Sequence, residues 1–205
     1  SHDEVVHGKK SLLDKMFGDY NQKFDAYKAF LTYYMTMPGK KLMFMGGEIG
    51  QFLEWRFDDQ LEWNILDIDK HRMLNQYIKT LNHMYTEEKA LWQLEQSWDG
   101  FEWINEADNE NSVVSYMRKG KKKDDLLVVT ANFTALDRRN YKLGVPYEGE
   151  YEIILHSNST EFGGERKINK MTYVAKHEQF KDMDYTLSVP IDGNSAMILK
   201  RKIKK

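Results

Sequence analysis

The stretch VVSYMRKGKKKDDLLVVTANF, residues 113–133, indicates the fold of the C-terminal half of the chain. Its apolar segments, 113–117 and 126–133, are separated by a polar turn that contains Gly120. Short apolar segments on both sides of a glycine-containing turn are typical of neighbouring antiparallel strands. The stretch therefore predicts two strands of an antiparallel β-domain.

The same pattern extends through the rest of the C-terminal half. The further predicted strands are 141–145, 151–155, 185–189 and 196–199. The turn signals around them are residues 109–111, Gly149, Gly163-Gly164 and residues 192–194. Short strands at this spacing predict an antiparallel β-sandwich.

Two helices are predicted in the N-terminal half. The first begins after an N-cap at Asp19 and ends at Pro38-Gly39. Its apolar face consists of Phe24, Tyr27, Leu31, Tyr34 and Met35. The second is predicted over residues 71–88, which place apolar side chains on one face in the same way.

A buried strand is predicted between these helices, over residues 41–45. The run Leu42–Met45 is apolar on both faces, which is typical of a strand in a parallel sheet covered on both sides. Helix, buried strand and helix in this order predict part of a (β/α) barrel or of a doubly wound sheet. The change of pattern near residue 94 predicts two domains, 1–94 and 95–205.

Composition limits the classes of partner. The chain has 205 residues, with 30 basic and 32 acidic side chains and a net charge of −2, which gives no reason to expect a nucleic acid or an anionic membrane. It has no cysteine and no apolar span long enough to cross a membrane. We therefore expect a cytoplasmic protein. Because the chain opens at Ser1 inside a dense polar motif, we also expect it to be cut from a longer protein.

That opening motif, SHDEVVHGK at residues 1–9, is the densest polar cluster. A zinc-protease helix needs two histidines four positions apart, whereas His2 and His7 are five apart, so no metal site is predicted. No Gly-x-Ser-x-Gly nucleophile turn is present, and the glycines at 46–50 do not have the spacing of a dinucleotide fingerprint. Taken alone, His2 and Asp3 are also compatible with capping a frayed end.

The wider sequence around this motif resembles a known family. Residues 1–16 are similar to the last signature region of the α-amylase superfamily, in the form found in the glycogen (1,4-α-glucan) branching enzymes. The resemblance continues through PGKKLMFMGGE (38–48), Glu54-Trp55, LEW (61–63), GFEWI (100–104) and NFT (132–134), and so covers nearly the whole chain. It implies the last strands and helices of a (β/α)8 TIM barrel, followed by an antiparallel β-sandwich domain. Residues 1–6 would end the seventh barrel strand and 41–45 would be the eighth.

The resemblance also implies an activity. The parent enzyme would be a retaining glycosyltransferase that cleaves α-1,4-glucan (glycogen, amylose) and passes the chain to a 6-hydroxyl, without a metal or organic cofactor. Asp3 would be the carboxylate that stabilises the transition state, with His2 as its hydrogen-bonding neighbour at the mouth of the barrel. The nucleophile and the general acid belong to earlier strands, whose motifs this sequence lacks. We therefore expect the chain alone to be inactive.

Glu48 and Trp55 are the predicted substrate-binding residues, because the resemblance puts both at the mouth of the eighth strand. Glu4 would point to the opposite face of the strand from Asp3, which favours a structural role. The tryptophans at 92, 98 and 103 are predicted to pack at the junction of the two domains.

Two other functions stay open. The β-domain could be a non-catalytic glucan-binding or docking module, or the chain could come from a debranching or trehalose-forming enzyme, against which the residues Val5–Lys9 argue. A barrel reduced to its last two strands would leave strand edges and apolar helix faces uncovered. We therefore expect self-association through those surfaces, or partial disorder before Phe24.

Overall fold

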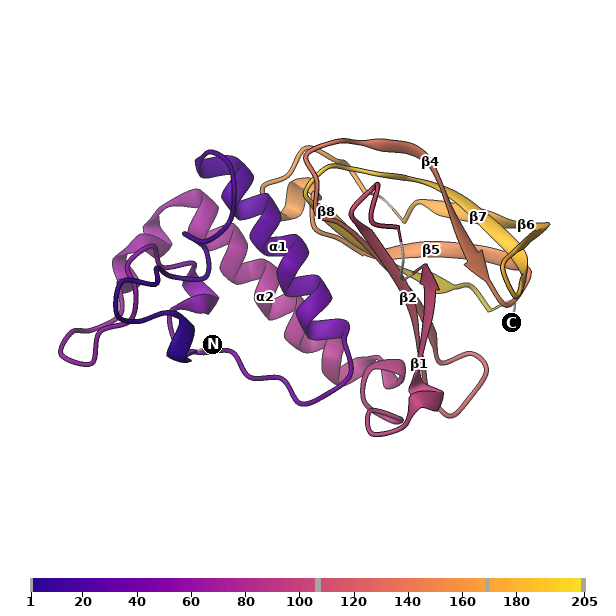
Figure 1. Cartoon of the computed structure of the whole chain (residues 1–205), viewed down its shortest axis with the longest axis horizontal. Coiled ribbons are helices and arrows are strands. Elements are labelled where there is room, and N and C mark those ends of the chain that lie inside the picture. Colours follow the sequence, from indigo (N-terminus) through magenta and orange to yellow (C-terminus); the bar gives the residue numbers. More distant parts are fainter. Residues whose placement is uncertain (1, 106–107, 169, 204–205) are drawn as a thin grey trace.

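The computed structural model describes residues 2–105, 108–168 and 170–203, apart from the side chain of His2. In this part of the chain two α-helices, α1 (Tyr20–Thr36) and α2 (Asp69–Glu87), precede the strands. The strands are β1 (Phe101–Asn105), β2 (Val113–Lys119), β3 (Leu126–Asn132), β4 (Arg138–Val145), β5 (Gly149–His156), β6 (Thr172–Phe180), β7 (Met183–Ile191) and β8 (Ser195–Arg201). Short 3-10 helices are η1 (His2–Glu4), η2 (Gly47–Ile49), η3 (Trp63–Asp67), η4 (Lys89–Leu91), η5 (Trp98–Gly100) and η6 (Thr160–Phe162). The two long helices lie side by side on one side of the β-structure (Figure 1).

The strands form one curled antiparallel sheet in the order β1-β2-β3-β8-β5-β6-β7-β4. β6 pairs with β5 through residues 172–175 and with β7 through residues 176–180, so the sheet bends along this strand. The bend encloses a core to which both layers contribute, including Val128, Leu199, Leu143 and Leu187, all fully buried. The predicted antiparallel all-β architecture is confirmed.

All six strands predicted in the C-terminal half are present, and two further strands there were not predicted. β1 has only Phe101 and Ile104 buried, so its sequence FEWIN shows no regular alternation. β6 is exposed along most of its length, and its sequence contains more polar than apolar residues. Both were missed because hydrogen bonds to neighbouring strands, rather than an apolar face, determine their strand conformation.

Helix α1 begins where the sequence predicts. The Asp19 carboxylate accepts from the backbone N–H of Gln22, and the Gln22 side chain accepts from the backbone N–H of Asp19, both at 2.9 Å. This reciprocal pair is a capping box, which satisfies two N–H groups that the helix cannot pair internally. The helix ends at Thr36, before Pro38.

Two predicted strands are wrong for this chain. Residues 2–4 form η1, and residues 40–44 are extended without a strand partner, leaving Leu42 63% and Met45 50% exposed. The Tyr34 hydroxyl hydrogen-bonds to both the N–H and the carbonyl of Leu42. A strand needs the backbone groups of a neighbouring strand, and the described segments supply none here. The (β/α)8 barrel is accordingly not formed within this chain.

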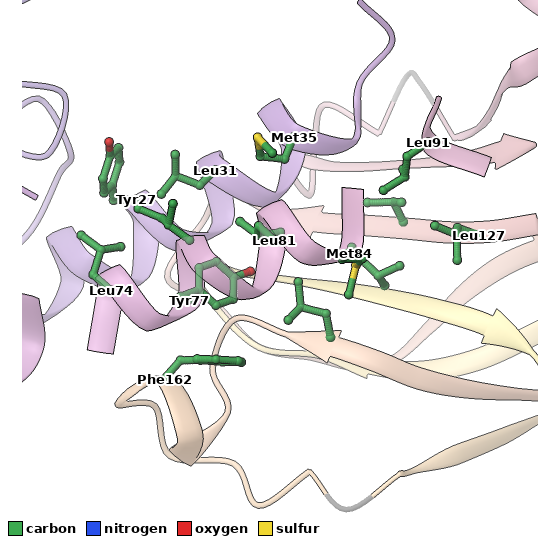
Figure 2. Close-up of a cluster of buried hydrophobic side chains, with 14 of the residues drawn as sticks. Tyr27, Leu31, Met35, Leu74, Tyr77, Leu81, Met84, Leu91, Leu127 and Phe162 are labelled. Carbon is green, nitrogen blue, oxygen red and sulfur yellow. The ribbon is translucent and has the colours of Figure 1, made fainter. Parts of the chain in front are cut away.

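The helices and the β-domain share one apolar core. Leu31, Leu74 and Leu81 from the helices join side chains on the outer face of the sheet. Those sheet residues are Tyr116, Leu127, Val129, Leu155 and Ile198. Figure 2 shows Phe162 of η6 facing Tyr77 of α2, with ring centroids 4.9 Å apart. The sheet is therefore covered by helices on one face and by its own curled end on the other.

Arg118 is a fully buried cation at the contact between the helices and the β-domain. Its guanidinium donates to the carbonyls of Gly100 at 3.2 Å and Leu91 at 2.9 Å, and also to that of Thr36. Burial lowers the pKa of Arg118. One side chain of β2 thus connects the end of α1, η4 and η5.

Candidate functional site

Two segments distant in sequence form an open groove of about 570 Å³ at the helical end of the molecule. Asp3 lines this groove together with Phe44, Met45 and Trp55. The backbone N–H of Trp55 donates to the carbonyl of Val5 at 2.9 Å, which joins the two segments directly. The structure therefore places two of the predicted site residues, Asp3 and Trp55, in one groove.

The groove has aromatic walls. Trp55 is half-buried and packs edge-on against Phe44, with ring centroids 5.5 Å apart. Phe57, two positions further along, also lines the groove and is 86% exposed. Aromatic faces beside polar groups suit a ligand that has both apolar ring faces and hydroxyl groups.

Charges of both signs surround this aromatic wall. The Arg56 guanidinium pairs with the Asp58 carboxylate at 3.3 Å, and this hydrogen bond lowers the pKa of Asp58. The Lys9 ammonium donates to the backbone carbonyl of Asp3 at 2.8 Å and pairs with Glu4 at 3.3 Å. Glu4 also lies 3.8 Å from Lys15, so its carboxylate is directed toward lysines, as a structural role requires.

Glu54, next to Trp55, binds the loop that follows the Asp3 segment. Its two carboxylate oxygens accept from the backbone N–H of Gly8 at 2.9 and 2.8 Å, and one accepts from that of Lys10 at 3.3 Å. Neither Glu54 nor Phe57 was predicted as a site residue. Their position on both sides of Trp55 in the sequence was the available signal.

The other two predicted site residues are Glu48 and His2. Glu48 lies in η2 and is not among the residues that line the groove. Its carbonyl accepts from Asn75 of α2 at 2.9 Å, and its charge, after burial, contributes to raising the pKa of Tyr27. The His2 side chain lies outside the described part of the chain. The structure thus joins Asp3 with Trp55 and leaves Glu48 apart from them.

A second polar groove, also of about 570 Å³, lies between the first turns of α1 and loops of the β-domain and contains the Asp192 carboxylate. Asp192 accepts from Arg166 at 2.6 and 2.5 Å and from Asn158 at 2.9 Å, with buried His156 at 3.9 Å. The backbone N–H of Asn158 donates to His156 Nδ1 at 3.1 Å. These contacts satisfy the buried carboxylate internally, which indicates a structural cluster.

Because His156 is buried in this cluster, we expect the protein to lose stability in mild acid. Burial lowers the pKa of His156 to about 4, whereas an unfolded chain binds the same proton near 6.5. The contribution is therefore complete above pH 6.5 and is lost as the pH falls from 6.5 toward 4. We expect the free energy of unfolding to drop by about 2 kcal/mol between pH 7.5 and 5.0. Urea unfolding at both pH values measures it.

The variant His156→Gln should lose most of this pH dependence, since glutamine does not titrate. The control His83→Gln changes an exposed histidine of α2 and should keep it. An unchanged pH dependence in His156→Gln would assign the effect to another group.

Among the described residues, no group of three His, Asp or Glu side chains is arranged to hold a metal ion. Nor does the part of the chain that was described contain a helix long and apolar enough to span a bilayer.

The tryptophans predicted to pack at the junction of the two domains are covered only in part. Trp92 is 42% and Trp103 38% exposed, and Trp98 is 84% exposed.

Residues 103–202, about half of the chain, match the family described as the alpha amylase, C-terminal all-beta domain. The fold of nearly the whole chain is similar to that of solved structures. These include an alpha-amylase from H. orenii (TM-score 0.60, 17% identity, 98% of this chain, 38% of that one). A pullulanase from Anoxybacillus sp. LM18-11 complexed with maltotetraose gives TM-score 0.60 at 13% identity, over 94% of this chain and 26% of that one.

More similar in sequence are 1,4-alpha-glucan branching enzymes. That of Desulfitobacterium hafniense is 45% identical over 203 residues, which are 99% of this chain and 32% of that protein. That of Halothermothrix orenii is 43% identical over 200 residues, or 98% of this chain and 32% of that protein. The predicted resemblance is confirmed: the chain is similar over nearly its whole length to a C-terminal portion of these enzymes. It spans about a third of the length of the curated relatives it matches.

Proposed function

We propose that this chain is the C-terminal part of a cytoplasmic α-glucan branching enzyme, and that its groove is one wall of the active site. The observation that carries the proposal is the meeting of Asp3 and Trp55 in a single groove, although the sequence separates them widely. The similarity to branching enzymes over 98% or more of the chain supports the substrate class.

In the proposed enzyme, residues 1–94 complete a (β/α)8 barrel and residues 95–205 form its C-terminal domain. The nucleophile and the general acid lie in the rest of that barrel. The exposed run that contains Leu42 and Met45 would then gain strand partners, which explains why it is apolar on both faces. No metal or organic cofactor takes part.

Asp3 would act on the sugar ring beside the bond that breaks. A carboxylate there accepts hydrogen bonds from ring hydroxyls, with His2 as a second contact. These bonds strengthen as the ring distorts toward its oxocarbenium-like transition state, so they lower the barrier rather than only binding the substrate. Trp55 would stack on a neighbouring glucose. Glu48 would be a further substrate contact.

The test uses the polypeptide in which this chain is joined to its barrel. We expect Asp3→Asn to lower the rate of α-1,6 branch formation on amylose by about 10²–10³-fold, since it removes the charge that stabilises the transition state. Glu4→Gln, its matched neighbour, should leave the rate within about twofold. The 205-residue chain alone should form no branches. Normal branching by Asp3→Asn, or by the chain alone, would contradict the proposal.

Isolation should also change the association state. The exposed Leu42, Met45, Leu53 and Phe57 lie on the side that the remainder of the barrel would cover. We propose that the isolated chain self-associates through them, whereas a clean monomer in light scattering would count against this.

A second candidate function is non-catalytic glucan binding by the β-domain. It is favoured by the exposed rings of Trp98 and Trp103, the latter packed edge-on against Phe101 at 4.8 Å. Affinity electrophoresis in glycogen distinguishes it, because a domain without a sugar-binding surface migrates without retardation.

A further inference from the structure

We propose that Glu54 is a positioning residue that holds the Asp3 segment at the groove, an inference that rests on the proposed function. Residues 2–10 contain η1 but no strand, so no sheet hydrogen bonds fix this segment in the described structure. A group that stabilises a transition state must nevertheless be held close to its productive position. Glu54 binds this segment through three hydrogen bonds from its backbone.

The first step in this positioning is the set of hydrogen bonds between Glu54 and the loop that contains Gly8 and Lys10. Both of its oxygens accept from Gly8, and one also accepts from Lys10. The backbone of His7, Gly8 and Lys10 is left-handed, with φ of 58°, 80° and 69°. Such a conformation is unfavourable for residues with a side chain. The N–H groups of Gly8 and Lys10 both point to the Glu54 carboxylate, whereas the N–H of Lys9 between them donates to the carbonyl of Val6 at 3.3 Å.

The second step connects the loop to Asp3. Lys9 lies between the two residues that Glu54 holds, and its ammonium donates to the backbone carbonyl of Asp3 at 2.8 Å. On the other side, the N–H of Trp55 donates to the carbonyl of Val5 at 2.9 Å. Glu54 therefore fixes the segment at Gly8 and Lys10, and Trp55 fixes it at Val5. Glu54, the residue before Trp55, thereby aligns the Asp3 carboxylate with the aromatic wall of the groove.

The experiment compares variants in the polypeptide that joins this chain to its barrel. Glu54→Gln keeps the size of the side chain but loses the charge and one of the two accepting oxygens, and the NH2 group that replaces this oxygen cannot accept from the Gly8 N–H. We expect kcat for branch formation to fall about tenfold, with KM within about twofold, because binding by the aromatic wall is retained while Asp3 is misplaced. In the 205-residue chain, the amide hydrogens of Gly8 and Lys10 should exchange faster.

Two further variants complete the test. Asp137→Asn is a matched control, since Asp137 also accepts from a backbone N–H, that of Gly193 at 2.9 Å, and does not line the groove that contains Asp3; it should leave kcat unchanged. Lys9→Met removes the link to Asp3 at an exposed position that does not endanger folding, and should lower kcat about threefold.

The outcomes separate the two proposals. A lower kcat in Glu54→Gln and Lys9→Met, but not in Asp137→Asn, supports the positioning role. If both variants keep the wild-type kcat while Asp3→Asn is inactive, the positioning role is wrong and the proposed function stands. If Asp3→Asn is as active as wild type, both are wrong. Should Glu54→Gln fail to fold, Lys9→Met decides.

Discussion

Replacing Arg118 with methionine is expected to lower the free energy of unfolding by about 3–5 kcal/mol. Methionine fills a similar volume but donates no hydrogen bond. The carbonyls of Thr36, Leu91 and Gly100 would therefore be left buried without this donor. Because these three carbonyls belong to α1, η4 and η5, the loss would also loosen the contact between the helices and β2.

Urea unfolding followed by tryptophan fluorescence measures this effect. Lys119→Met is the matched control, since Lys119 follows on the same strand but is partly exposed and pairs at 2.7 Å with the partly exposed Glu102. Exposed pairs of this kind contribute at most about 1 kcal/mol. Equal stability of Arg118→Met and Lys119→Met would show that the buried guanidinium does not hold the helices to the sheet.

Removal of residues 1–94 is expected to abolish the cooperative fold of the β-domain. The helices cover Tyr116, Leu127, Val129, Leu155 and Ile198, none of them more than 4% exposed. Each such side chain contributes about 1.5–3 kcal/mol through burial. Together they are comparable with the entire stability of an ordinary domain, about 5–15 kcal/mol. Residues 95–205 alone should aggregate, or should bind a hydrophobic dye and melt without a sharp transition.

The control for this truncation is a variant of residues 95–205 that is changed only on the sheet face that the helices normally cover. In residues 95–205, replacing Leu127, Val129 and Ile198 by threonine keeps β-branched or strand-compatible side chains while removing apolar surface. This variant should be more soluble than the unmodified fragment. A monomeric, sharply melting fragment 95–205 without these replacements would mean that the helices are dispensable for the β-domain.

Local sequence was sufficient for much of the fold. The six strands that alternate or run apolar were predicted because burial of their side chains makes them strands. The capping box at Asp19 and the stop before Pro38 were predicted because both depend on residues within one turn of the helix. β1 and β6 were missed because their partners, rather than their own side chains, keep them extended.

The candidate site was predictable only in part. Asp3, Trp55 and Glu48 were all predicted through resemblance, with Glu48 at the end of a strand over residues 41–45; the structure brings Asp3 and Trp55 into one groove, whose lining does not include Glu48. That segment forms no strand, and the backbone carbonyl of Glu48 accepts from Asn75 of α2. A strand exists only with a neighbour, so apolar character alone could not fix the position of the residue that follows it.

The sequence by itself determined the two long helices, six of the eight described strands, where α1 begins, and the kind of family to which the chain is similar. Those features depend on side-chain periodicity and on groups a few residues apart. Tertiary structure alone decided that Arg118 joins three segments, that Glu54 holds the loop after Asp3, and that His156 is buried beside Asp192. Each of these depends on bringing distant backbone groups within hydrogen-bond distance, and only the packing of helices on a curled sheet determines those distances.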